Sequence, residues 1–170
     1  VVSRHPRPLT APDASALERH CSRIGLDATG ALDVDIVVPS AGRSLPGGGP
    51  VAVTALLESM PPEDGVRFTI IIGDEFESDA GAIRRPDVRV IRRPSGPFNF
   101  SAAVNQGILA ASAHHVLLLN DDTTQVADGS VARMAAHLAD PGVAAVGALL
   151  TYPDGTCLLY TSPSPRDRYI

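Results

Sequence analysis

Two carboxylates, Asp121 and Asp122, follow directly after an apolar run, with Asn120 just before them. The run, 116–119, is continuous, and such a run is typical of a strand buried on both faces of a parallel sheet. Ligands of open α/β sheets lie just beyond the carboxyl ends of these strands, and carboxylate oxygens there suit a divalent cation that holds phosphates. The triplet 120–122 therefore points to nucleotide-diphosphate chemistry. The alternative is an ordinary turn, because Asn and Asp are common in turns.

Polar residues also follow the other apolar runs of the chain. Ser40 and Arg43 come after a run that ends at Pro39, and Asp74 comes after a second run. Arg92 and Arg93 follow a third run, where either one of them faces a diphosphate or both are solvated. Because parallel strands end at the same edge of a sheet, we expect these residues to lie along one edge with the triplet. Their joint position is stronger evidence than any one motif.

The elements that would position these residues alternate between strands and helices, which predicts an α/β fold. We expect a mostly parallel sheet with helices on both faces, and Asn99 as the cap of one helix. The predicted strands are 34–39, 67–72, 88–91, 115–119 and 143–150, the predicted helices are 13–25, 51–60, 99–113 and 129–139, and a turn is predicted at 152–155.

Composition narrows the function classes. The chain has 170 residues, is 44% hydrophobic and carries a net charge of −5, so it can bury a core, and its acidity argues against a nucleic-acid partner. All 14 basic residues are Arg, which excludes Schiff-base and P-loop lysines. No apolar run approaches the 18 residues of a membrane span. The two cysteines form no metal or disulfide framework, so a cytoplasmic location is expected.

Four stretches, in order, resemble the inverting family 2 glycosyltransferases of the GT-A fold, especially rhamnosyltransferase-like members that build bacterial surface polysaccharides. They are 34–40, 69–74, 96–107 and 117–122, and the last looks like the family's Asp-X-Asp motif in an Asn-first form. With the later 152–156, the resemblance runs from about residue 33 to 156. It implies a GT-A, Rossmann-like sheet, truncated at its carboxyl terminus. One departure is Gly73, which stands where the family often has an Asp.

The resemblance also implies roles for single residues. Asp122 would bind Mg²⁺ or Mn²⁺, while Asp121 would support it or contact the donor, a solvated turn residue being the alternative. The alternative for Arg43 is an ordinary surface arginine, and for Asp74 it is a solvated loop carboxylate. The expected donor-binding residues are Pro39, Ser40 and Arg43 along the base and phosphates, Asp74 at the base, Asn120 at ribose or sugar hydroxyls, and Asn105 and Asp121 at the donor.

The implied reaction is metal-dependent transfer of a hexose-type sugar, with inversion, from a nucleotide-sugar donor to a polysaccharide or glycolipid acceptor. No catalytic residue is identified, since the family's general base lies in a carboxyl-terminal half that is missing here. The fragment is therefore expected to be inactive alone. Missing regions would also supply a peripheral contact to the inner face of the plasma membrane. The alternatives are a nucleotidyltransferase and a non-catalytic sugar-nucleotide-binding module.

Three segments are expected along the chain. Residues 1–32 form a tail and a short helix, and the chain begins at Val1 and not at Met, as a fragment would. Residues 33–156 form the nucleotide-sugar-binding half of the transferase domain. Residues 157–170 begin with a stretch that resembles the in-frame translation of a transposon-end adapter used in DNA sequencing. The native protein is therefore expected to end near Thr156.

Overall fold

The computed structural model describes residues 32–45, 49–74, 76, 83–125, 127–152 and 154–156. The chain divides into two compact units, Ala31–Ala135 and the combination of Val1–Gly30 with Ala136–Ile170. The helix predicted at 13–25 and the adapter-like stretch after residue 156 lie outside the described residues. Within the described ranges, no helix is both long and apolar enough to cross a membrane.

The unit Ala31–Ala135 is built on a four-stranded sheet in the order β3-β2-β1-β4, with every neighbouring pair parallel. Val37 of β1 pairs with Thr69 of β2 on one side and with Leu118 of β4 on the other. The predicted α/β architecture is confirmed, and the seven elements predicted between residues 34 and 139 form within three residues of their expected bounds. They are β1 Val34–Pro39, α2 Ala52–Ser59, β2 Val66–Ile72, β3 Val88–Arg92, α3 Phe100–Ala110, β4 His115–Leu118 and α4 Ser130–His137.

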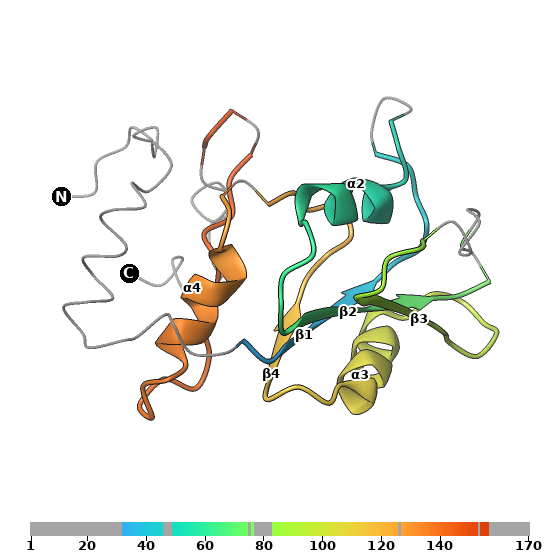
Figure 1. Ribbon diagram of the computed structural model, residues 1–170. Coiled ribbons are helices and arrows are strands. Elements are labelled where there is room, and N and C mark those ends of the chain that lie inside the picture. The colour runs from blue at the N-terminus through green and yellow to red at the C-terminus, as the bar shows by residue number, and fades with distance from the viewer. Residues whose placement is uncertain are drawn as a thin grey trace, which may run out of the picture. The chain divides into compact units, whose positions relative to one another are not determined.

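The two faces of the sheet are covered by different helices, α2 on one and α3 on the other (Figure 1). Ile36 and Val38 pack with Leu56 of α2 in the main core, because alternate residues of a strand point to the same face. On the other face, Val37 lies against Gly107 of α3, where a Cβ atom would clash with the valine methyls. All six residues of β1 are buried, as expected for the centre of a parallel sheet.

The prediction that the run 116–119 is buried on both faces is wrong. Val116 and Leu118 are 40% and 49% exposed. The reason is the strand order, which puts β4 at the edge of the described sheet, while α3 packs on β1 and β2. The apolar run does form a parallel strand, but the strand that is buried on both faces is β1.

The unit that includes Ala136–Ile170 departs from the prediction in one respect. No strand forms at 143–150, so the predicted fifth strand is wrong. An apolar run becomes a strand only where a neighbouring strand accepts its hydrogen bonds, and no described segment pairs along 143–150. The predicted turn is confirmed at its described residues, because the N–H of Gly155 donates to the carbonyl oxygen of Tyr152 at 2.8 Å.

A buried carboxylate fixes the amino edge of the sheet. Asp35 of β1 is 2% exposed and accepts hydrogen bonds from Arg67 Nε at 2.9 Å and from the backbone N–H groups of Ser112 and Ala113 at 2.6 and 2.8 Å. Burial acts to raise the pKa of Asp35, but these hydrogen bonds outweigh it and lower the pKa. Arg67 also pairs with Asp33 at 2.8 Å. The contacts with Ser112 and Ala113 tie the connection between α3 and β4 to β1, and so help to set the register of β4 against β1.

Candidate functional site

The first part of the candidate site is the loop that follows β1. Pro39 ends the strand and is buried. Ser40 is 1% exposed, and its N–H donates to the carbonyl oxygen of Ile71 at 2.9 Å, which holds the loop against β2. The Ser40 hydroxyl accepts from the N–H of Gly42 at 3.1 Å and donates to Oδ2 of Asp121 at 2.6 Å. This hydrogen bond joins the segments that follow β1 and β4, in agreement with the prediction that they lie at one edge of the sheet.

Gly42 is required by both its backbone and its surroundings. Its φ of +71° lies in the left-handed region that favours glycine, and a Cβ atom there would lie 2.7 Å from Cδ2 of Phe76. The buried ring of Phe76 therefore packs under the loop, a role that no pattern in the sequence indicated. Beyond Gly42, Arg43 is exposed and its carbonyl oxygen accepts from the N–H of Ala52 at 2.9 Å, which ties the loop to α2.

The second part of the site is the triplet after β4. The N–H of Leu119 donates to the carbonyl oxygen of Val37 at 3.1 Å, and β4 ends opposite Val37, two residues before the end of β1. Asn120 and Asp122 are exposed, and Asp121 is half-buried between them. The triplet is therefore a turn and also a pair of carboxylates at the sheet edge, so the two interpretations of its sequence are compatible.

Charges of both signs act on Asp121. Burial raises the pKa of this carboxyl, the hydrogen bond from Ser40 lowers it, the charge of Asp122 raises it and the charge of Arg43 lowers it, with a net rise. A second carboxylate and a guanidinium therefore both act on the Asp121 carboxyl at this edge. Such a mixed set suits a ligand that brings both negative phosphate oxygens and a cation.

The oxygen ligands of this cluster fit a divalent cation that is held partly by a bound ligand. Among the described residues, no group of three or more His, Cys, Asp or Glu side chains could hold a metal ion by itself. Mg²⁺ commonly takes one or two carboxylates together with substrate phosphates and water. Asp122 is exposed and Asp121 has one oxygen engaged by Ser40. The residues therefore fit a cation that arrives with a diphosphate, and do not form a cage of protein ligands.

The remaining predicted residues lie apart from this cluster. Asp74 is exposed and follows β2 at the same edge. Asn105 is exposed on α3, about 7.5 Å along the helix axis from its first residue, Phe100. No described hydrogen bond links either side chain to the Ser40–Asp121 pair. Asn99 is the helix cap that its position predicted, because its side chain accepts from the N–H of Ala102 at 3.0 Å.

Arg93 orders the segment between β3 and α3. The sequence left the role of this residue open. It donates to the carbonyl oxygens of Gly96 and Pro97 at 2.9 and 3.2 Å, and its guanidinium lies 5.6 Å from the centre of the Phe98 ring. A Cβ atom on Gly73 would clash with this guanidinium. The glycine that departs from the family pattern therefore makes room for Arg93. The only clue in the sequence was the pairing of a small residue after one strand with an Arg after the next.

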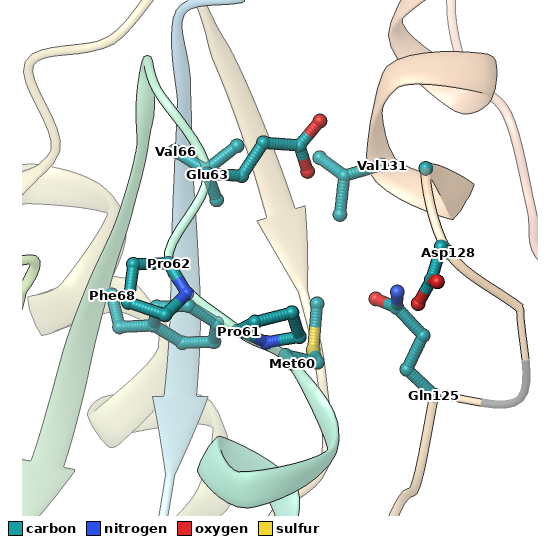
Figure 2. A pocket seen from close by; sticks show the side chains of 10 residues that line it. Met60, Pro61, Pro62, Glu63, Val66, Phe68, Gln125, Asp128 and Val131 are labelled. Atoms are coloured by element: carbon teal, nitrogen blue, oxygen red, sulfur yellow. The ribbon is translucent and has the colours of Figure 1, made fainter.

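A pocket of about 190 Å³ lies away from the polar cluster. Figure 2 shows Met60, Pro61 and Pro62, from the end of α2, on one side and Gln125, Asp128 and Val131 on the other. It includes Val66, the first residue of β2, so it lies toward the amino ends of the strands. We place the candidate site at the polar cluster because no basic residue lines the pocket, whereas the charge of Arg43 acts on Asp121 at the carboxyl edge.

Comparisons with known proteins cover much of the chain. A family model described as glycosyl transferase family 2 matches residues 67–168, which is more than half of the chain. An uncharacterized protein, y4gI, of Sinorhizobium fredii (strain NBRC 101917 / NGR234) is 37% identical over 95 residues. That similarity covers 52% of this chain and 10% of the relative, so the chain spans about a tenth of the relative's length. The family match runs past Thr156, and the boundary expected there stays a prediction.

Proposed function

The chain belongs to glycosyl transferase family 2, and from this premise we propose that it forms the donor-binding part of an inverting, metal-dependent transferase. The donor would be a nucleotide sugar. The observation that carries the proposal is the hydrogen bond between Ser40 and Asp121, which brings the loop after β1 and the acids after β4 together. Ligands of open α/β sheets bind beyond the carboxyl ends of the strands, which is where this juxtaposition lies.

The charged residues of the cluster have complementary tasks in this proposal. Asp122, with the remaining oxygen of Asp121, would hold Mg²⁺ or Mn²⁺ through carboxylate oxygens. When bound, this cation supplies neutralisation of the negative charge on the departing diphosphate. Arg43 would donate charge-assisted hydrogen bonds to phosphate oxygens from the other side of the loop. Its exposure and the attachment of its backbone to α2 support that role.

The uncharged and peripheral residues would orient the donor. Asn120 would bond to ribose or sugar hydroxyls and Asp74 would accept from an N–H of the base, since both are exposed and follow strands at the same edge. Pro39 would form part of the floor under the nucleotide. Asn105 would reach the donor from α3, which requires a donor group that extends along that helix.

Catalysis needs a further group. In an inverting transfer, a general base must lie within hydrogen-bond reach of the acceptor hydroxyl. We place that base in sequence beyond residue 156, so residues 1–156 would bind the donor without completing transfer. The acceptor would be a bacterial surface polysaccharide or a lipid-linked glycan at the inner face of the plasma membrane. This part of the proposal rests on the four motifs that resemble rhamnosyltransferase-like members.

Calorimetry with nucleoside diphosphates tests the proposal. UDP, GDP, CDP, ADP and dTDP are titrated into the protein with and without Mn²⁺, and the matching triphosphates are titrated in parallel. We expect at least one diphosphate to bind only when Mn²⁺ is present. A preference for triphosphates would favour nucleotidyl transfer, and no binding of any nucleotide would contradict the donor site.

A variant pair adds a control to this experiment. Asp122→Ala should remove the Mn²⁺-dependent binding, because it deletes the exposed carboxylate of the cluster. Asp64→Ala deletes an exposed carboxylate in the turn before β2 and should leave binding unchanged. Equal binding by both variants would exclude Asp122 as the cation ligand.

A further inference from the structure

The hydroxyl of Ser40 makes two hydrogen bonds inside the protein. A serine hydroxyl has one hydrogen to donate and two lone pairs that accept. Its hydrogen goes to Oδ2 of Asp121 at 2.6 Å, and one lone pair accepts from the N–H of Gly42 at 3.1 Å. With Ser40 only 1% exposed, little of its surface is left for a ligand.

The same hydrogen bond restricts Asp121. Because Oδ2 faces Ser40, rotation of the carboxylate is opposed and its other oxygen, Oδ1, is the one left for a ligand. The two residues are 81 positions apart in the sequence, so the contact links separate strand ends and not a local turn. Since Asp122 is the next residue along the backbone, an ordered Asp121 also restricts the direction in which Asp122 leaves the turn.

The loop that carries Ser40 is itself held firmly. Phe76 packs against Gly42 from below, and the Ser40 N–H is bonded to Ile71 of β2. A hydroxyl on such a loop is a fixed reference point for the acids after β4. Groups that orient the ligands of a cation in this way commonly change affinity by about 10- to 100-fold when they are lost.

We propose that Ser40 is a positioning residue, which orients Asp121 and with it Asp122 toward a cation–diphosphate pair, and that it does not itself contact the donor. The proposal rests on the proposed function, because it needs a cation and a diphosphate at this edge. It would replace the expectation that Ser40 lines the base and phosphates.

The test compares three Ser40 variants in nucleoside-diphosphate calorimetry with and without Mn²⁺. Ser40→Ala and Ser40→Cys remove the hydroxyl or replace it with a weak donor, whereas Ser40→Thr keeps it. We expect Mn²⁺-dependent affinity to fall about 10- to 100-fold in the Ala and Cys variants. Any Mn²⁺-independent affinity should stay unchanged, and the Thr variant should retain most of the Mn²⁺-dependent affinity. Ser44→Ala, at an exposed serine in the same loop, is the matched control and should behave like the wild type.

Thermal unfolding separates positioning from general destabilisation. If Ser40→Ala does not fold, the Cys variant decides, because it keeps an atom in the place of the hydroxyl oxygen. Wild-type affinity in the Ala or Cys variant would overturn the inference, and so would an equal loss with and without Mn²⁺. If the wild type binds no nucleoside diphosphate with Mn²⁺, the proposed function fails and the inference falls with it. If the wild type binds and the Ser40 variants match it, only the inference fails.

Discussion

Gly107 offers a sharp test of how α3 packs on the sheet that carries the site. The residue is buried, and a Cβ atom there would approach Cγ1 of Val37 to well below 3.0 Å, a separation that real Cβ atoms essentially never show. Cγ2 and Cβ of Val37 would lie at 3.2 and 3.3 Å. Turning the valine side chain therefore relieves one contact and leaves the others, so α3 must move away from β1.

The sign of the effect of Gly107→Ala follows from two opposing contributions. Alanine favours a helix interior over glycine by about 1 kcal/mol. Overpacking a tight core costs about 1–3 kcal/mol, and sometimes more. Because Val37 lies on β1, the fully buried central strand, the clash should dominate. We expect the free energy of unfolding to fall by about 1–2 kcal/mol, the balance of these two contributions.

Urea unfolding, followed by far-ultraviolet circular dichroism, measures this change. A second variant, Val37→Ala, removes the methyl groups that the new Cβ atom would meet. The double variant should be more stable than the sum of the two single changes predicts, since the residues are in contact. A Gly107→Ala variant more stable than the wild type would refute the packing of α3 against β1.

Two further predictions concern the frame of the sheet. Asp35→Asn should lower the free energy of unfolding by about 1–3 kcal/mol, because an amide NH₂ replaces an acceptor that faces hydrogen-bond donors. The pKa values of Asp35 and Asp33 are lowered from 3.8 in the folded state. Their stabilisation is therefore complete above that value and is lost as the pH falls through the lowered values, and acid unfolding should show a shallower pH dependence in Asp35→Asn. Asn99→Ala should cost about 1 kcal/mol in urea unfolding through loss of the helix cap, whereas Asn105→Ala, exposed in the same helix, should cost nothing measurable.

Local sequence patterns predicted most of the strands and helices, but they did not predict which elements lie beside one another. The run 34–39 gave the bounds of β1 correctly because a continuous apolar stretch that ends in proline is a strand in almost any context. For the similar run at 116–119 the predicted burial was wrong, since the exposure of Val116 depends on strand order and not on local sequence. The prediction of a strand at 143–150 was wrong for a related reason. A strand needs a neighbouring strand to pair with, and its own residues do not specify that neighbour.

The site shows the same division between what a pattern contains and what the fold adds. Parallel topology was sufficient to expect Ser40 and Asp121 at one edge. It could not specify that their side chains share a hydrogen bond, because that contact depends on the conformation of a loop held by Gly42 and Phe76. The contact between Gly73 and Arg93 was likewise not predicted, since it joins the ends of two strands through one long side chain.

The central claim is that the acids after β4 hold a cation only together with a nucleoside diphosphate. Calorimetry of the wild type with Mn²⁺ alone, a diphosphate alone and both together tests it most directly, with Asp122→Ala and Asp64→Ala as the variant pair. We predict strong binding only for the combination, its loss in Asp122→Ala and its retention in Asp64→Ala. Binding that survives in Asp122→Ala, or tight binding of Mn²⁺ without nucleotide, would contradict the claim.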